Sequence, residues 1–263
     1  KGSMTLVDQK VSEKVLKEID FIKKDSGGSV ANTIASISLL GLSSFFCGKV
    51  KKDELGDEFV SDMQKTNTAF LCDQSPEGPP TARCIVFVTP DGERSMQTFL
   101  GASTTLAKED IRKSFFEEVD YFLIEGYLWS SETARDAINQ SLKFIKNKNI
   151  KVVFSLSDSG LVKMFKDDFL NFIHDNVDIL IGNENEFDEL FNGNDELNYI
   201  EKTKTEIVIK TKGERGAQIF QLNKVENISS CKVDSVVDTT GAGDMFAAGF
   251  LYKLLIGEDP KKA

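Results

Sequence analysis

Four apolar runs, YFLIE (121–125), KVVFSL (151–156), DILI (178–181) and EIVIK (206–210), recur along the second half of the chain. The stretches between them place apolar residues with helical spacing, at 132–146, 161–174 and 185–191. Apolar strands alternating with amphipathic helices are typical of parallel sheets, because each crossover uses a helix and both sheet faces are buried. The sequence therefore predicts an α/β fold with a mostly parallel sheet between two helical layers.

The first hundred residues follow a different pattern. The elements predicted there are strands at 4–7 and 44–50, helices at 9–21 and 31–40, and two β-like runs at 81–89 and 94–100. The two runs are separated by Pro90-Asp91-Gly92-Glu93, where proline presets φ and glycine allows positive φ. We expect a β-hairpin in a small sheet apart from the main body. Further along, a second hairpin begins at 216–222 and a last helix covers 242–255.

Composition excludes several classes of protein. The chain of 263 residues has 32 basic and 42 acidic residues, a net charge of −10, and nucleic acids and anionic membranes both need a basic face. We therefore expect no nucleic-acid partner and no membrane partner. The four cysteines form no CxxC pair, which argues against a zinc site or a redox dithiol. The single histidine is His174, so a Ser-His-Asp triad could be built only around that residue. No signal peptide is visible, so we expect a cytoplasmic protein.

Polar or glycine residues follow each of the four apolar runs. They are Glu125-Gly126, Ser157-Asp158, Asn183-Glu184 and Thr211-Lys212-Gly213. Ligands of open parallel sheets bind beyond the carboxyl ends of the strands, so these residues are candidates for a ligand-facing edge. Loops are polar in general, and this pattern alone leaves that simpler interpretation open.

The strongest local motif is Asp238-Thr239-Thr240-Gly241-Ala242-Gly243-Asp244, directly before the last predicted helix. Small residues at a helix start leave backbone N–H groups open to an anion, and the helix dipole favours negative charge there. This suits a phosphate or a phosphoryl group in transfer, with Asp244 as a base beside it. The alternative is a capped helix start whose aspartate complements the dipole.

A second glycine turn opens the helix at 31–40. It reads Gly27-Gly28-Ser29-Val30-Ala31-Asn32, in which serine and asparagine can bind the hydroxyl groups of a ligand. The alternative is that Ser29 is simply an N-cap. Two rival glycine motifs are excluded. A dinucleotide fingerprint needs glycine where Phe246 stands, and a P-loop needs Ser or Thr where Val50 follows Gly48-Lys49.

Together these segments resemble the signatures of the PfkB family of carbohydrate kinases, the superfamily of ribokinase and adenosine kinase. The C-terminal signature is similar to Asp238–Asp244 and its continuation to Phe250, and the N-terminal one to Gly27–Asn32 and its continuation to Gly56. Asn183-Glu184-Asn185-Glu186 resembles the family's Asn-x-x-Glu motif, and Thr211–Gly216 resembles its nucleotide loop. The four motifs stand in the family's order over most of the chain.

The resemblance implies a ribokinase-like fold with a small β lid, and transfer of the γ-phosphoryl group of ATP to a primary hydroxyl of a sugar or nucleoside. It leans towards the adenosine-kinase-like branch. Asp244 would be the catalytic base, with anion-hole amides from Gly241, Ala242 and Gly243. The substrate would contact Gly27, Gly28, Ser29, Asn32, Glu125 and Arg94. ATP would contact Asn183, Thr211, Gly213, Gly216 and Thr240, and Asn183 and Glu186 would serve Mg²⁺.

The resemblance also sets the domain expectation. We expect one kinase domain over 1–263, with lid segments at about 1–8 and 68–100, working as a monomer or a homodimer. The family's first strand and C-terminal helices have no counterpart between Lys1 and Ala263, so we expect them to be missing from these residues. The alternative function is a catalytically silent sugar- or nucleotide-binding protein on the same fold, which the presence of Asp244 argues against.

Overall fold

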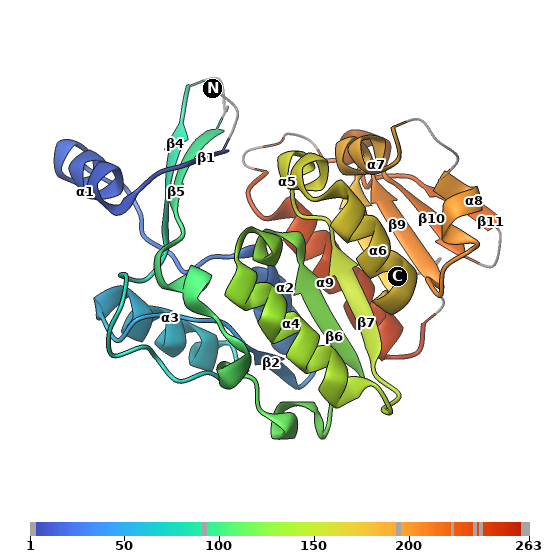
Figure 1. Ribbon diagram of the computed structural model, residues 1–263. Helices are drawn as coiled ribbons and strands as arrows, with labels where there is room; N and C mark the ends of the chain where they lie inside the picture. Colours follow the sequence, from blue (N-terminus) through green and yellow to red (C-terminus); the bar gives the residue numbers. More distant parts are fainter. Residues whose placement is uncertain are drawn as a thin grey trace.

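The predicted sheet is confirmed as six strands in the order β11-β10-β9-β8-β7-β6 (Figure 1). The structure, a computed structural model, describes residues 4–90, 94–192, 196–221, 224–233, 236 and 239–258, with the backbone only for Arg94. The strands are β6 (Tyr121–Glu125), β7 (Lys151–Ser155), β8 (Ile179–Asn183), β9 (Ile207–Thr211), β10 (Ala217–Gln221) and β11 (Lys224–Ile228). The pairs from β6 to β9 are parallel, and β10 is antiparallel to both β9 and β11.

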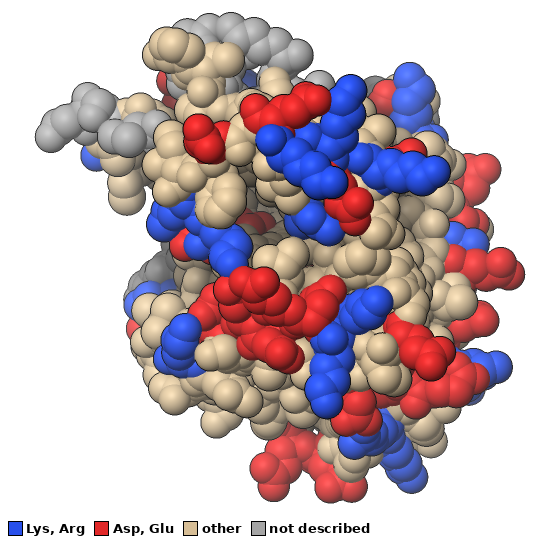
Figure 2. Space-filling model, turned by 90° about the vertical axis from the view of Figure 1, so that its left-hand side faces the viewer, with Lys and Arg blue, Asp and Glu red and all other residues tan. Residues whose placement is uncertain are grey.

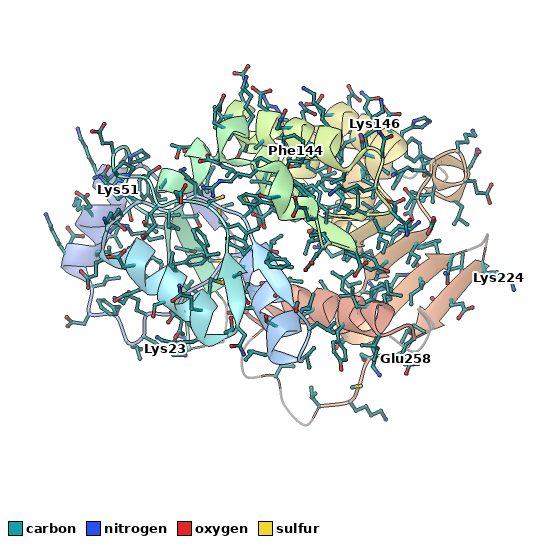
Figure 3. The ribbon with its side chains drawn as sticks, turned by 90° about the horizontal axis from the view of Figure 1, so that it is seen from below. Lys23, Lys51, Phe144, Lys146, Lys224 and Glu258 are labelled. Carbon is teal, nitrogen blue, oxygen red and sulfur yellow. The ribbon has the colours of Figure 1, made fainter. Side chains whose placement is uncertain are left out.

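Helices cover both faces of this sheet (Figures 1 and 3). One layer contains α4 (Glu132–Ile145), α5 (Ser159–Met164), α6 (Lys166–Asn176) and α7 (Glu184–Phe191), with the short α8 (Glu196–Ile200) beside them. The other contains α2 (Ser29–Leu39) and α9 (Ala242–Leu255). In Figure 3 the labelled Phe144 marks the α4 layer, on the opposite side of the strands from α9. The ribokinase-like three-layer arrangement expected from the sequence is therefore confirmed.

Each central strand sends alternate side chains into the two cores. Val152, Phe154 and Leu180 pack with the α4–α7 layer. Their chain neighbours Val153 and Ile179 pack with α2 and α9. Successive residues of a strand point to opposite faces, so a strand buried on both sides must be apolar throughout. This explains why the four apolar runs show no alternation with polar residues.

Two smaller sheets are built from the first hundred residues. One has the order β1-β5-β4 and is made of β1 (Met4–Leu6), β4 (Arg83–Val88) and β5 (Arg94–Phe99). It rises from the main body, and α1 (Gln9–Glu18) lies beside it (Figure 1). The second is a parallel pair, β2 (Ser44–Phe46) and β3 (Thr68–Phe70), with α3 (Glu54–Lys65) between them in the chain. The hairpin is thus confirmed, while its turn at 91–93 lies outside the described residues.

Several elements differ from the sequence prediction. The helix expected at 161–174 is two helices, because Phe165 leaves the helical conformation with φ −115° and ψ 29°. Helix α3 was not predicted; Asp53 caps it by accepting a hydrogen bond from Gly56 N at 2.9 Å. Strand β3 falls within the expected lid segment 68–100 but pairs with β2 and not with the hairpin.

Short 3₁₀ helices complete the described structure, at η1 (Gly101–Thr105), η2 (Lys108–Asp110), η3 (Lys113–Phe116), η4 (Gly126–Ser130) and η5 (Gly213–Arg215). On the face that carries α1 and α3, acidic and basic side chains are interspersed, without one continuous basic area among the residues drawn in colour (Figure 2). Among the described residues, no helix combines the length and apolar character that crossing a membrane requires.

Candidate active site

The N-terminal ends of α2 and α9 meet beside the carboxyl end of β6, and Asp244 joins them. Its Oδ1 accepts a hydrogen bond from Ser29 Oγ at 2.8 Å, and its Oδ2 accepts one from Asn32 Nδ2 at 2.8 Å. Thr33 Oγ1 donates to the backbone carbonyl of Asp244 at 3.2 Å. The spacing of Ser29, Asn32 and Thr33 places all three on one face of α2. This polar face fixes the orientation of the Asp244 carboxylate.

Helix α9 starts on a glycine turn with no side-chain cap. Gly241 is the N-cap residue and has φ +72°, a left-handed conformation that L side chains adopt at a cost. The N–H of Ala242 donates to Thr239 O at 3.2 Å, and that of Met245 donates to Gly241 O at 2.8 Å. The N–H groups of Gly243 and Asp244, which lie between Ala242 and Met245, have no acceptor within the described part of the chain. Gly243 and Asp244 therefore present open donors next to the carboxylate of Asp244, whereas the N–H of Ala242, which the sequence predicted for the anion hole, is used within the turn.

Glu125 adds a second carboxylate at the start of α2. It ends β6, and its Oε2 accepts a hydrogen bond from the backbone N–H of Val30 at 3.2 Å. Part of the residue reaches the surface, but the carboxyl group itself is surrounded by protein. The pKa of Glu125 is raised to about 7, mainly by loss of water; the Val30 N–H opposes this rise and the nearby charge of Asp244 adds to it. This glutamate therefore changes charge near neutral pH.

At the end of β8, Asn183 and Glu186 form a closed capping box. Asn183 Oδ1 accepts from Glu186 N at 3.0 Å, while the two Glu186 oxygens accept from Asn183 N at 2.8 Å and Asn183 Nδ2 at 2.7 Å. The Glu186 side chain is buried. Burial raises its pKa to about 7, opposed by the Asn183 N–H and assisted by the charge of Asp158.

The loop after β9 lies beside this capping box. Thr211 Oγ1 donates to Gly182 O at 3.4 Å, and Arg215 forms an ion pair with Glu184. Gly213 and Gly216 have φ +57° and +84°. A Cβ on Gly216 would lie 1.9 Å from Ile228 O, so only glycine fits where this loop turns into β10. The loop thus places Thr211 and Gly213 at the same carboxyl end of the sheet as Asn183.

Sequence reasoning did not identify Tyr127, and it found Ser157 only as one of the polar residues that follow the strands; the two residues contact each other beyond the ends of β6 and β7. Tyr127 Oη donates to Ser157 O at 3.3 Å, and the N–H of Gly126 donates to Ser157 Oγ at 2.9 Å. Ser157 has φ +72°, an unusual conformation outside glycine that often marks functional sites. Its only sequence signal was its place directly after a strand.

The pKa of the Tyr127 phenol reflects several carboxylates that lie near one another around it. Burial raises the Tyr127 pKa, and four carboxylates add to the shift, those of Asp158, Glu125, Glu186 and Asp244. They come from four different elements at the carboxyl ends of β6, β7 and β8 and at the start of α9. A region with this much negative charge favours a cation or a cation-bound ligand.

The remaining sequence candidates are placed less fully. Gly28, with φ +118°, is the N-cap of α2, and Gly27 precedes it on the surface. Thr240 is exposed beside the α9 turn. The side chain of Arg94 and the whole of Asp238 lie outside the described residues.

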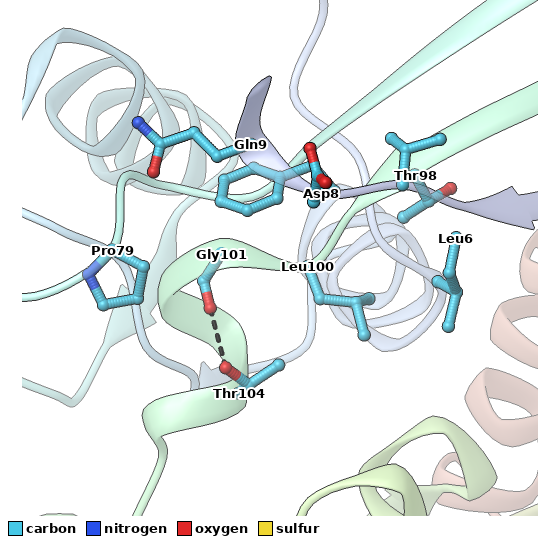
Figure 4. A pocket seen from close by; sticks show the side chains of 10 residues that line it. Leu6, Asp8, Gln9, Pro79, Thr98, Leu100, Gly101 and Thr104 are labelled. Atoms are coloured by element: carbon cyan, nitrogen blue, oxygen red, sulfur yellow. Dashed lines mark hydrogen bonds between the residues drawn. The ribbon is translucent and has the colours of Figure 1, made fainter. Parts of the chain in front are cut away.

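A cavity of about 270 Å³ lies where the three-stranded sheet joins the body (Figure 4). Its wall is mainly apolar and includes Leu6, Pro79, Phe99 and Leu100. Thr104 lines it too, with its Oγ1 donating to Gly101 O at 2.9 Å. This cavity offers packing for an apolar group and few polar contacts.

Comparison with known proteins agrees with this geometry. The family model described as pfkB family carbohydrate kinase matches residues 3–263. A 5-dehydro-2-deoxygluconokinase from Halalkalibacterium halodurans is 26% identical over 257 residues, covering 92% of this chain and 77% of the relative.

Two solved structures superpose closely. An adenosine kinase from Sinorhizobium meliloti has a TM-score of 0.92 and 32% identity, covering 100% of this chain and 81% of that one. A probable sugar kinase from Rhizobium etli has a TM-score of 0.92 and 33% identity, with 99% and 80% covered.

Proposed function

Because this chain belongs to the pfkB family of carbohydrate kinases, we propose that it transfers the γ-phosphoryl group of ATP to a primary hydroxyl of a sugar or nucleoside, with Asp244 as the base. The observation that carries the assignment of Asp244 is its place beside the open N–H groups of α9, with both carboxylate oxygens oriented by α2. A base and an anion site side by side are what phosphoryl transfer to an alcohol needs.

Asp244 can act without releasing its partners. Each carboxylate oxygen has two lone pairs. One lone pair can keep the hydrogen bond from Ser29 or Asn32 while the other lone pair of the same oxygen accepts the proton of a substrate hydroxyl. The hydroxyl oxygen then attacks the γ-phosphorus in line with the departing ADP. The N–H groups of Gly243 and Asp244 stabilise negative charge on the transferring group, and Gly241 and Ala242 shape that turn.

The nucleotide side of the site is proposed from the second group of residues. Asn183, Thr211, Gly213 and Gly216 line the sheet edge next to the acidic region, and Thr240 flanks the α9 turn. ATP phosphates placed between these two sides would put the γ-phosphoryl group at the start of α9.

Mg²⁺ fits this arrangement as an ion held mostly by phosphate and water. Asn183 and Glu186 supply the oxygen donors that Mg²⁺ prefers, but both Glu186 oxygens already accept hydrogen bonds from Asn183. Among the described residues, no three Asp, Glu, His or Cys side chains form a metal cage. When bound with ATP, the ion would neutralise phosphate charge, and Glu186 would act on it through water.

The acceptor side is proposed to use Gly27, Gly28, Ser29, Asn32 and Glu125, together with Arg94. The chain is proposed to work as one kinase domain. The strands β1, β4 and β5 would act as its lid, within the segments 1–8 and 68–100, and exclude water during transfer.

The test is a panel of nucleosides and sugars incubated with the protein and Mg-ATP. ADP formation should rise with at least one acceptor, and ³¹P NMR should place the new phosphate on a primary hydroxyl. The opposite result is an acceptor that raises the thermal midpoint but never stimulates ADP formation, which would support a catalytically silent binding protein.

A further inference from the structure

Cys47 and Cys72 lie in contact at the ends of two paired strands. Cys47 follows β2 and Cys72 lies two residues beyond β3, and the strand pairing continues as far as a bond from Leu71 N to Phe46 O at 2.9 Å. The two Sγ atoms are 2.9 Å apart, and both residues are free cysteines. The chain's other cysteines, Cys84 and Cys231, are exposed.

The surroundings hold this pair in place. Cys72 is buried in a small core with Leu106 and Ala137, and Cys47 packs against the same core. Lys49, two residues from Cys47, forms a largely buried ion pair with Asp110. Because backbone pairing and core packing bring the two thiols together, their approach belongs to the fold and not to mobile surface chains.

The two thiols differ in acidity. The hydrogen bond with Cys47 lowers the pKa of the Cys72 thiol, against the opposing effects of burial and the Asp110 charge and with smaller help from the Gly48 N–H and the Lys49 charge. The same hydrogen bond, together with burial, raises the pKa of Cys47. Cys72 is therefore the thiolate that forms first, and thiolates are the form that reacts with oxidants.

We propose that Cys47 and Cys72 are a reversible redox modification site, which peroxides convert into an intramolecular disulfide. The Cys72 thiolate attacks one peroxide oxygen, the O–O bond breaks, and the leaving hydroxide takes up a proton to give water. Cys47 then loses its proton and attacks the Cys72 sulfenic sulfur, and the S–O bond breaks to release the second water. In sum, two thiols and one hydrogen peroxide give one disulfide and two waters.

The disulfide would form where the β4–β5 hairpin joins the body. Thr81, just before β4, donates through its backbone N–H and its Oγ1 to Asp53, at 2.9 and 2.6 Å. Lys51 N in turn donates to Thr81 Oγ1 at 3.0 Å, so the chain after Cys47 holds the start of the hairpin. On the other side, η1 follows β5 and leads to Leu106, which packs on Cys72. Both ends of the hairpin are thus tied to segments next to the pair.

The direct test uses the full chain with the exposed cysteines replaced, C84S/C231S, so that only the proposed pair can react. The protein is treated with hydrogen peroxide, unfolded, alkylated with N-ethylmaleimide and weighed by mass spectrometry. We expect no alkylation and the loss of two hydrogen atoms, about 2 Da, with full recovery of two thiols after dithiothreitol. Digestion without reductant should give one peptide linking residues 47 and 72.

A second measurement keeps the proposal falsifiable if substitution of Cys47 disturbs folding. In the C84S/C231S protein, oxidation should raise the thermal midpoint by roughly 5 °C, since a disulfide restricts the unfolded chain. C47S in the same background should show neither the mass loss nor the rise. Two alkylated thiols after peroxide, or Cys72 converted to sulfinic acid in place of a disulfide, would overturn the proposal. So would equally fast cross-linking in urea, because the fold would then not direct it.

Discussion

Helices α9 and α7 both begin at the carboxyl edge of the sheet, but one N-terminus is open and the other is closed. At α9 the N-cap is Gly241, and the N–H groups of Gly243 and Asp244 have no acceptor among the described residues. At α7, the Asn183 side chain accepts a hydrogen bond from the N–H of Glu186, and both Glu186 carboxylate oxygens accept hydrogen bonds from Asn183. The open end can receive an anion, whereas the closed end presents a buried carboxylate to a cation. Two helix N-termini thus favour ligands of opposite charge, an anion at α9 and a cation at α7, and they differ in the residue at the N-cap.

The strongest way to break this contrast is to close α9. In G241D the new carboxylate would occupy the anion site and lie next to Asp244, since a Cβ at this position is 3.7 Å from Asp244 Oδ2. We expect kcat to fall by about 10²- to 10³-fold, the cost of losing a preorganised anion site.

The matched control is G241N, which has nearly the same shape, tolerates left-handed φ and carries no charge. Steady-state rates should show a clearly smaller loss for G241N. Equal losses in the two variants would mean that shape, and not charge at an open helix end, governs the site.

The N-terminus of α2 is a third case, because the carboxylate that accepts a hydrogen bond there belongs to another element: Glu125 of β6. Glu125 has a pKa of about 7 in the folded protein against 4.5 for the free side chain. Between these values the folded state binds a proton that the unfolded state has lost, so the free energy of unfolding falls as pH rises through this interval. E125Q removes this dependence and should gain about 2 kcal/mol over wild type between pH 5 and pH 8.

Urea unfolding at both pH values measures this difference. Glu186 titrates in the same interval but is present in both proteins, so it cancels in the comparison. Parallel pH dependence of wild type and E125Q would show that Glu125 is ionised throughout.

The smallest effect is expected at the closed terminus. E186Q removes the negative charge that would act on Mg²⁺ through water, and outer residues of metal sites typically change affinity by about tenfold. The Mg²⁺ concentration for half-maximal activity should rise accordingly.

E184Q is the control for that variant, since Glu184 lies two residues earlier and pairs with Arg215. It should leave the Mg²⁺ requirement nearly unchanged. A rise of the same size in E184Q would assign the effect to general surface charge.

The sequence was most informative where one residue type has one physical role. Apolar runs such as KVVFSL had to be strands buried on both faces, and β7 is one. The prediction was wrong where tertiary contacts decide. Helix α3 depends on a cap by Asp53, whose other oxygen is held by Thr81, a partner far along the chain. The break at Phe165 has no glycine or proline to mark it.

The same division applies to the site. Asp244, Ser29 and Asn32 were each found from motifs, but their direct hydrogen bonds link residues more than 200 positions apart. Local patterns carry no signal for such contacts. Tyr127 was missed, and Ser157 was found only as one of several polar residues after strands, because a tyrosine in a short 3₁₀ helix and a serine after a strand look like ordinary loop residues. Their importance appears only from the strained φ of Ser157 and the carboxylates around Tyr127.

The central claim is that Asp244 is the base of a kinase site at the open end of α9. The most direct measurement is the single-turnover rate of D244N, which keeps the shape of the side chain and can still pair with Ser29. The rate should fall by about 10²- to 10⁴-fold, the range for loss of a general base, while acceptor binding measured by calorimetry stays within about threefold of wild type. A D244N protein that binds its acceptor normally and keeps a rate near that of wild type would contradict the account.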